Sequence, residues 1–147
     1  MRGEYRMACV RPFRLSDYAK AADLLQDVLS EACFEETIEA FGRQLSWDSE
    51  LVLVATEGQE IVGVIIGTID DNDGYFYRIA VARPYQRKGI GRSLIAELGK
   101  RFARREVRKV WVTLDNHNES FLPFYESLGF GSMDFLRSVK RLRIVNG

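Results

Sequence analysis

The feature that most constrains the fold is a change of hydrophobic period midway along the chain. Residues 51–56, 61–69 and 75–81 form short β-branched and apolar runs separated by turn residues, which is typical of strands joined as hairpins. From 90 to 102 the apolar residues recur every three or four positions, which predicts a helix, and residues 109–114 return to a strand pattern. A strand, a helix and a second strand in succession predict a crossover between parallel strands. The chain is therefore expected to form a mixed sheet.

Weaker patterns place further elements around this sheet. Residues 10–14 are expected to form a first strand, and Ser16 is a candidate N-cap for a helix whose apolar residues follow at spacings of three and four. A second helix is expected from about Glu35 to Leu45, and a short one from about Ser120 to Leu128. Gly129 suits the position after that short helix, and the strand pattern resumes directly behind it.

An acidic segment between two of the predicted strands invites a calcium-binding interpretation. The segment reads Asp-Asp-Asn-Asp-Gly over residues 70–74. An EF-hand loop that turned at Gly74 would need an acidic residue five positions earlier, where the chain has Ile69. A solvated hairpin turn through Asp73 and Gly74 is therefore the expectation.

Length and composition indicate one globular domain over residues 1–147. The chain is 46% hydrophobic and 29% charged, which excludes disordered and low-complexity classes. Its apolar runs are shorter than the roughly 18 residues that a membrane span needs, and its start lacks a secretory apolar stretch, so we expect a cytoplasmic protein without membrane contact. Cys9 and Cys33 lie far apart without metal-type spacing, which predicts reduced, partly buried thiols and no metal site.

The net charge of zero conceals a strong division between the two halves of the chain. Residues 1–73 carry 6 basic and 15 acidic side chains, whereas residues 74–147 carry 15 basic and 6 acidic ones. This division favours an anionic partner for the second half and a cationic partner for the first.

The segment Gln86–Arg92 lies between a predicted strand and the start of the basic, amphipathic helix. Its two glycines, Gly89 and Gly91, let the backbone approach a ligand closely, and the first amides of a helix point outward with partial positive charge. Such a segment can hold a pyrophosphate, and its basic side chains add attraction. A tight strand-to-helix turn without a ligand is the structural alternative.

Two nucleotide-binding motifs fail on spacing in this segment. A Walker loop needs four residues between its glycines, followed by Lys and then Ser or Thr, but only one residue separates Gly89 from Gly91. A dinucleotide fingerprint needs a third glycine where the chain has Leu94.

The chain resembles the GNAT superfamily of N-acetyltransferases. Their acetyl-CoA signature reads Gln or Arg, two residues, Gly, one residue, and Gly or Ala, and residues 86–91 match it. A later motif agrees, since Asn118 precedes a predicted helix with Phe124-Tyr125 that ends before Gly129-Phe130. The resemblance implies an α/β (α+β) fold with a mixed, mostly antiparallel sheet of six to seven strands and about four helices, over a core from about residue 8 to 140.

The resemblance also implies where acetyl-CoA would bind. The backbone amides after Gln86 would hold the pyrophosphate, and the main chain of the preceding strand would pair with the pantetheine arm. Asn118 would bond to the pantetheine portion. The residues that the resemblance assigns to the cosubstrate are Ile79, Val81, Gln86, Arg87, Lys88, Gly89, Ile90, Gly91, Arg92, Asn118 and Tyr125.

For catalysis the resemblance suggests two groups. A bulge in the strand would direct the amide of Ile79 at the thioester carbonyl as an oxyanion donor, and Tyr125 would act as general acid toward the sulfur. Spacing alone favours a core tyrosine at this position, and the preceding motif reverses that preference. A Glu often found on this strand in the family has no counterpart, because the region reads Tyr77-Arg78, so no base is named. His117, the only histidine, is expected to be a surface or capping residue.

The implied activity is transfer of an acetyl group from acetyl-CoA to a primary amine by direct attack in a ternary complex. The alternative is a noncatalytic acyl-CoA-binding sensor or interaction module. A small-molecule amine, or the lysine or N-terminal amine of a peptide, would be the acceptor, and the acidic residues near Glu35 and Glu36 would suit a cationic one. A homodimer is a candidate assembly. Nucleic acid is not expected as a partner, because the basic residues near the C-terminus suit a solvated strand face.

Overall fold

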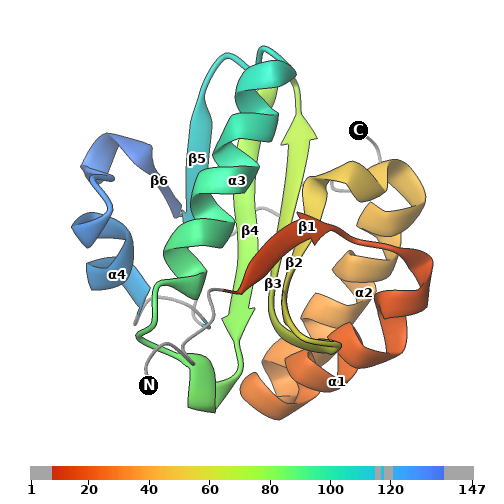
Figure 1. Ribbon diagram of the computed structural model, residues 1–147. Coiled ribbons are helices and arrows are strands. Elements are labelled where there is room, and N and C mark those ends of the chain that lie inside the picture. Colours follow the sequence, from red (N-terminus) through yellow and green to blue (C-terminus); the bar gives the residue numbers. More distant parts are fainter. Residues whose placement is uncertain (1–7, 115–116, 118–120, 138–147) are drawn as a thin grey trace.

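The computed structural model describes residues 8–114, 117 and 121–137. These residues form a six-stranded sheet in the order β1-β2-β3-β4-β5-β6, with four α-helices around it (Figure 1). The strands are β1 (Cys9–Pro12), β2 (Val52–Glu57), β3 (Glu60–Asp70), β4 (Asp73–Val81), β5 (Val110–Leu114) and β6 (Phe135–Arg137). The helices are α1 (Tyr18–Val28), α2 (Glu31–Asp48), α3 (Ile90–Arg104) and α4 (Leu122–Ser127). The predicted fold class is confirmed.

The sheet combines an antiparallel meander with a parallel crossover, as the change of hydrophobic period predicts. Strands β1 to β4 pair antiparallel, and the β2–β3 hairpin turns at Gly58, whose φ of 62° lies in the left-handed region. Helix α3 then returns the chain so that β5 pairs parallel to β4, and β6 continues the parallel part of the sheet.

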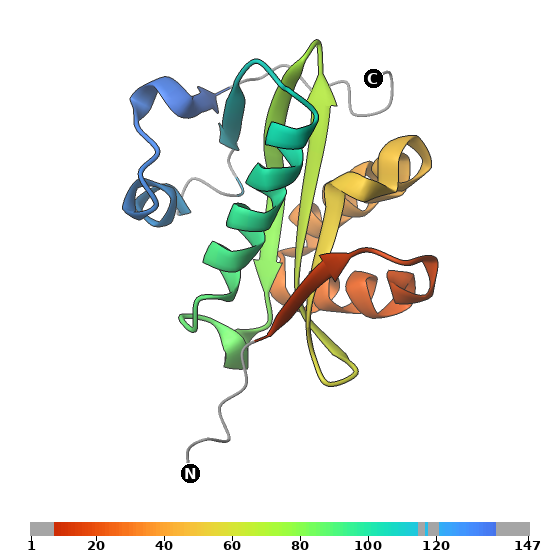
Figure 2. The same cartoon turned by 45° about the horizontal axis from the view of Figure 1, so that its top comes forward.

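Two hydrophobic cores fill the two faces of the sheet. Helices α1 and α2 cover one face, and α3 covers the other (Figure 2). Alternate residues of β3 serve the two cores, since Ile65 packs toward α3 and Ile66 packs toward α1 and α2. Helix α3 contributes a row of buried residues at helical spacing: Ile90, Leu94, Ile95, Leu98 and Phe102.

Several element boundaries differ from the prediction. Helix α2 begins at Glu31, because the Ser30 hydroxyl accepts a hydrogen bond from the Cys33 amide at 3.2 Å, and it continues to Asp48. Two polar residues on its buried face, Thr37 and Gln44, interrupt the apolar pattern from which the shorter helix was predicted. Ser16 is not an N-cap, since α1 begins at Tyr18 after a 3-10 turn.

The last strand also begins later than predicted. Helix α4 covers Leu122–Ser127, and β6 begins only at Phe135. A 3-10 turn precedes this strand, in which the Asp134 carboxylate accepts a hydrogen bond from the Gly131 amide at 2.8 Å.

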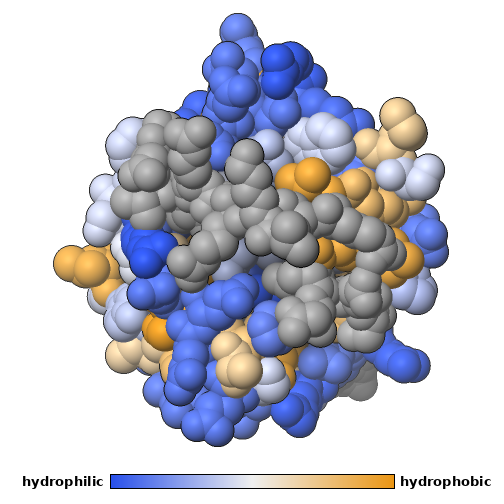
Figure 3. Space-filling view, turned by 180° about the vertical axis from the view of Figure 1, so that it is seen from behind, coloured by the Kyte–Doolittle hydropathy of each residue, from blue (hydrophilic) through white to orange (hydrophobic). Residues whose placement is uncertain are grey.

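The acidic turn between β3 and β4 lies one step earlier than predicted. Asp71 and Asn72 adopt left-handed backbone conformations, with φ of 53° and 70°, and form the exposed turn. Asp73 is instead buried and starts β4, where its carboxylate accepts hydrogen bonds from Arg108 Nε at 3.1 Å and Trp111 Nε1 at 3.1 Å. Seen from behind, the end of the molecule with this turn is hydrophilic (Figure 3).

A buried carboxylate joins β1 to the start of α1. Asp17 is 6% exposed and receives two hydrogen bonds from the Arg11 guanidinium, at 2.8 and 2.9 Å, and one from the Arg14 amide at 2.7 Å. The hydrogen bonds from Arg11, followed by that from the Arg14 amide, outweigh desolvation and lower the pKa of Asp17.

We therefore expect Asp17→Asn to destabilise the protein by about 1.5–3 kcal/mol at neutral pH. Because the pKa is lowered in the folded state, the unfolded chain binds the proton more readily. The stabilisation is thus present above the usual carboxyl pKa and is lost as the pH falls through the lowered value. Urea denaturation at neutral and strongly acidic pH measures this, with the neighbouring exposed Ser16→Ala as control. A difference between wild type and Asp17→Asn that does not shrink in acid would contradict the prediction.

Candidate functional site

Strand β4 carries a bulge at the point where its pairing with β5 ends. Ile66 pairs with Arg78 and Gly67 pairs with Phe76, so Tyr77 is an extra residue on β4. The β4–β5 ladder covers only residues 74–76 of β4, and β4 continues to Val81 past the end of β5 (Figure 1). The two strands therefore separate beyond Phe76, and we call the opening between them the β4–β5 splay.

A side chain of β5 fixes the start of this splay. The Thr113 hydroxyl lies 3.2 Å from the Phe76 carbonyl oxygen and 3.4 Å from that of Tyr77, where a continued ladder would place backbone amides. No local sequence pattern predicts this role of Thr113.

The main chain of Ile79 and Val81 faces the splay. Backbone groups alternate in direction along an antiparallel strand, and the Ala82 amide donates to the Val62 carbonyl of β3 at 2.8 Å. Ile79 and Val81, which alternate with Ala82 and Ala80, therefore direct their backbone groups away from β3. The Val81 carbonyl accepts a hydrogen bond from Gln86 Nε2 at 2.9 Å, which shows that this carbonyl points away from β3. Gln86 thus ties the following loop to the end of β4.

The loop after Gln86 leads into an uncapped helix start. Gly89 has a φ of 86° and precedes α3, and it supplies no side chain to cap the first amides of the helix. Its carbonyl accepts the first helical bond, from the Ser93 amide at 3.0 Å. The amides of Ile90, Gly91 and Arg92 consequently remain available to an anion at this end of α3.

The two glycines of the loop serve different purposes. A Cβ on Gly89 would have no atom within 4 Å, so the left-handed backbone, and not crowding by the protein, requires glycine there. A Cβ on Gly91 would lie 3.1 Å from the Phe124 ring and 3.6 Å from Ile79 Cδ1. Gly91 therefore allows α3 to lie close to both α4 and β4.

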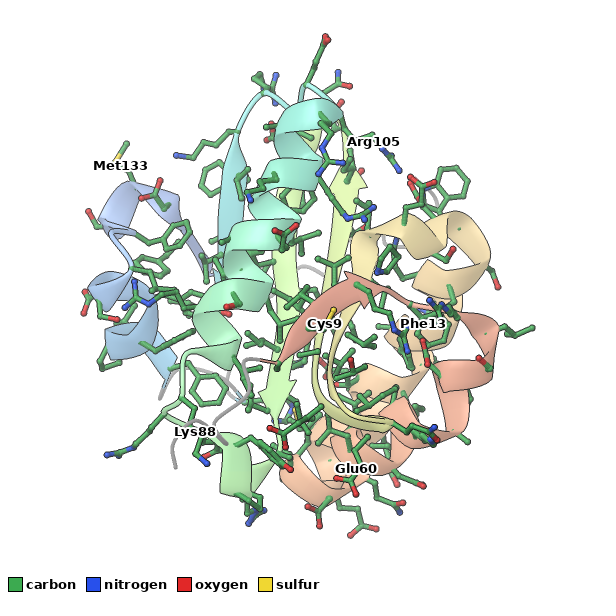
Figure 4. All side chains as sticks on the ribbon, in the orientation of Figure 1. Cys9, Phe13, Glu60, Lys88, Arg105 and Met133 are labelled. Atoms are coloured by element: carbon green, nitrogen blue, oxygen red, sulfur yellow. The ribbon has the colours of Figure 1, made fainter. Side chains whose placement is uncertain are left out.

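The basic side chains near the two ends of α3 differ in their ion pairing. Arg87 and Arg92 are exposed, and in the described part of the chain neither lies within ion-pair distance of a carboxylate. At the other end of the helix, Arg105 pairs with Asp48 at 2.8 Å and Glu50 at 3.2 Å. Figure 4 shows Lys88 and Arg105 at opposite ends of α3. Arg87, Lys88 and Arg92 are thus the basic residues that lie beside the loop, where they can meet an anion bound at the start of α3.

Tyr125 lies on the α3 side of the sheet and is 1% exposed. Helix α4 ends after Ser127 in a Schellman motif, in which Gly129 has a φ of 101° and the Phe130 amide donates to the Tyr125 carbonyl at 3.2 Å. Burial raises the pKa of the Tyr125 phenol far above its usual value, and the positive charge of Arg78 opposes that rise. The phenol is therefore neutral near physiological pH and can act only as a proton donor.

Arg78 is a polar residue of this region that sequence reasoning missed. Its side chain is buried at 3% exposure, and Nε donates to the Thr37 hydroxyl of α2 at 3.0 Å. Its Nη2 lies 3.5 Å from Glu36 Oε2, and Glu36 Oε1 lies 3.8 Å from His117 Nε2. An arginine inside an otherwise apolar strand was the available signal.

The structure brings most of the predicted site residues to one end of the sheet. Ile79, Val81, residues 86–92 and Tyr125 surround the β4–β5 splay and the start of α3. Asn118 lies outside the described residues. Of the acidic residues on α2, Glu36 reaches Arg78 of β4, whereas Glu35 and Glu39 lie about 160° away from Thr37 around the helix.

The described residues show neither a metal centre nor a membrane span. No three His, Cys, Asp or Glu side chains gather there in a way that could hold a metal ion. Cys33 is buried, but Cys9 is exposed, contrary to the expectation that both are partly buried. None of the helices in the described ranges is both long and apolar enough to cross a membrane.

Solved structures of acetyltransferases share this fold. The PaiA N-acetyltransferase from Thermoplasma acidophilum, in complex with coenzyme A, has a TM-score of 0.71 and 19% identity, covering 86% of this chain and 91% of that one. The ribosomal-protein-S18-alanine N-acetyltransferase from Escherichia coli has a TM-score of 0.64 and 24% identity, covering 85% and 78%. AAC(6′)-Iy, in complex with a bisubstrate analogue, has a TM-score of 0.73 and 12% identity, covering 93% and 99%.

The sequence itself matches a family in the same region. The profile described as "Acetyltransferase (GNAT) family" matches residues 20–130, from α1 through the end of α4. This range includes the splay, the uncapped start of α3 and Tyr125. The chain therefore belongs to the GNAT family of acetyltransferases.

Proposed function

We propose that this protein transfers an acetyl group from acetyl-CoA to a primary amine by direct attack in a ternary complex. One observation carries the proposal: the β4–β5 splay opens beside the uncapped start of α3. The splay offers strand-like main-chain groups, and the helix start offers amides to an anion. Acetyl-CoA carries its thioester on an extended arm that ends in a diphosphate. The arm can pair with the main-chain groups of the splay, and the diphosphate can bind the amides of the helix start.

The cosubstrate would be held mainly by backbone groups. The amides from Arg87 to Arg92 would bind the diphosphate, and the main chain of Ile79 and Val81 would pair with the pantetheine arm in the splay. The Ile79 amide would then face the thioester carbonyl and stabilise the charge that develops on its oxygen. Lys88 and Arg92 would add electrostatic attraction at the open end. Asn118 would contact the pantetheine, as proposed from the family motif.

Tyr125 would supply the proton that the departing sulfur needs. Its neutral phenol is the protonation state that a general acid requires before the reaction. The nearby charge of Arg78 favours the phenolate that forms when the proton leaves. Tyr125 also packs against Phe124 and Phe130, with ring centroids 5.4 and 6.1 Å away, so the core fixes its position.

A cationic amine would suit the α2 side of the splay. Glu36 places a carboxylate against β4 there, with 44% of its side chain exposed. The names of two similar structures mention an alanine of ribosomal protein S18 and an acetylneamine analogue, which are a peptide amine and an amino sugar. Both classes of acceptor therefore belong in a first panel.

The proposal is tested by thiol release from acetyl-CoA with a panel of amines. We expect release above background that depends on one of the added amines. A noncatalytic acyl-CoA-binding module would bind acetyl-CoA in calorimetry and release no thiol with any amine. That result would replace the proposal with the alternative function.

A smaller effect on acetyl-CoA binding is predicted for the basic side chain of Arg92 at the start of α3. Arg92→Gln should weaken acetyl-CoA binding about two- to fivefold, because an exposed ion pair contributes up to about 1 kcal/mol. The difference should shrink as salt is added. Arg104→Gln, at the exposed far end of the same helix, is the matched control and should leave binding unchanged. Calorimetry at two salt concentrations measures both variants, and equal effects from them would contradict the prediction.

A further inference from the structure

A cluster of side chains lies against β4 on the face opposite Tyr125. It consists of Arg78 from β4, Glu36 and Thr37 from α2, and His117 from the segment after β5, and we call it the Arg78 cluster. Arg78 immediately precedes Ile79, whose amide faces the splay. The cluster therefore borders the splay from the α1–α2 side, while Tyr125 borders it from the α3 side.

Contacts from two elements hold the charged centre of this cluster. The Arg78 guanidinium donates to Thr37, lies 3.5 Å from Glu36 and stacks over the Tyr77 ring at 4.9 Å. The bulge at Tyr77 places both Tyr77 and Arg78 toward α2, which regular alternation would forbid. The Glu36 carboxylate is thereby fixed between Arg78 and His117.

Acetyl transfer to an alkylamine needs a proton acceptor, and the α2 side of the splay is the side proposed above for a cationic amine. An alkylamine is protonated near neutral pH, and it attacks only after losing a proton. Arg78 is already protonated and cannot accept one, and neutral Tyr125 is a donor on the other face. Cys33 is buried behind Thr37, with its sulfur 3.7 Å from the Thr37 hydroxyl. Among the described groups of the cluster, Glu36 and His117 remain, and imidazole is the side chain whose unperturbed titration lies closest to neutral pH.

We propose that His117 accepts the proton of the acceptor ammonium and that Glu36 acts as a positioning residue that stabilises the resulting imidazolium. This assignment rests on the proposed acetyl transfer. Glu36 Oε1 lies 3.8 Å from His117 Nε2, so protonation of the ring turns a charge–neutral contact into an ion pair. Arg78 holds the other carboxylate oxygen and keeps Glu36 in place.

The protons balance over one cycle. The ammonium nitrogen gives one proton to the His117 imidazole, and the neutral amine then attacks the thioester carbon. The carbon–sulfur bond breaks while Tyr125 gives its proton to sulfur, and the new amide nitrogen returns its second proton to Tyr125. His117 releases its proton to solvent, which its 17% exposed side chain and that of Glu36, at 44%, can reach.

A pair of amines tests this assignment in the full-length protein. His117→Gln should lower kcat/KM for an alkylamine at neutral pH by about a hundredfold, the lower end of the range for losing a general base. The same variant should keep nearly wild-type activity toward an amine of low basicity, such as a hydrazide, which arrives already neutral. A merely structural role for His117 would lower both activities equally, and that result would overturn the assignment.

The pH dependence gives a second readout. With the alkylamine, wild-type kcat/KM should fall in acid, where a protonated His117 can no longer accept a proton, and this fall should be missing in His117→Gln. Glu36 faces His117, and Arg78, which stacks over the Tyr77 ring, lies beyond Glu36. Asp115 and Glu119 are near it in sequence but outside the described residues. An unchanged profile in the variant would overturn the assignment.

Matched variants separate this assignment from folding and from the proposed function. Glu36→Gln should lower alkylamine turnover several-fold, whereas Glu35→Gln, on the far side of α2, should not. Acetyl-CoA affinity should be unchanged in His117→Gln, Glu36→Gln and Glu35→Gln. If His117→Gln fails to fold, His117→Asn replaces it in the same assays. Wild-type protein that releases no thiol with any amine would refute the proposed function itself. A fully active His117→Gln would refute only the role of His117.

Discussion

Replacing Tyr125 with phenylalanine is expected to lower turnover by about a hundredfold to ten-thousandfold, the range for losing a general acid. The phenol is neutral and buried beside the splay, so the departing thiolate would lose its proton donor. The ring and its packing against Phe124 and Phe130 are retained, and acetyl-CoA affinity should therefore stay nearly constant. Thiol release at saturating substrates measures the turnover, and calorimetry measures the affinity.

Tyr75→Phe is the matched control for this experiment. Tyr75 lies near the start of β4, before the splay, and its replacement should leave turnover unchanged. Equal turnover of wild type and Tyr125→Phe, with both proteins folded, would show that Tyr125 is only a core residue.

Gly89→Val is expected to weaken acetyl-CoA binding by about tenfold to a hundredfold. A β-branched residue does not readily adopt the φ of 86° found at Gly89, so the loop and the first turn of α3 must rearrange. One lost charge-assisted hydrogen bond to a phosphate corresponds to about 1.5–3 kcal/mol, which gives this range. The space beside Gly89 is open to solvent or ligand, so clashes within the protein do not contribute. Calorimetry with acetyl-CoA measures the effect.

A second glycine provides the control for backbone strain. Gly58 also has a positive φ, 62°, but it lies in the β2–β3 turn. Gly58→Val should therefore cost stability without changing acetyl-CoA affinity. If both variants weakened binding equally, the loss at Gly89 would reflect general destabilisation and not a cradle for the diphosphate.

Features with a local sequence signal were predictable. The continuous apolar runs predicted the strands of the meander, because β2 and β3 are buried on both faces, and the period of 3.6 predicted α3, because one side of that helix faces a core. The left-handed Gly89 and Gly129 mark a helix start and a helix end, and their positions follow from backbone sterics alone. These local rules predicted the start of α3 and the end of α4 to within about one residue.

Features that depend on contacts between distant residues were not predictable. Asp73 is buried because Arg108 and Trp111, more than thirty positions later, donate hydrogen bonds to it, and the turn pattern alone made it look solvated. Arg78 and Glu36 are 42 positions apart, and only the bulge at Tyr77 turns Arg78 toward α2. The sequence predicted Glu35 and Glu36 as candidates near a cationic acceptor, but the contact that separates Glu36 from Glu35 appears only in the folded structure.

The most direct measurement is a calorimetric titration that compares coenzyme A with pantetheine, which shares the arm but lacks the diphosphate. If the start of α3 holds the diphosphate, coenzyme A should bind saturably at one site per chain and at least tenfold more tightly than pantetheine. Gly89→Val should remove most of that difference. A protein that binds neither compound, or binds both equally well, would contradict the account.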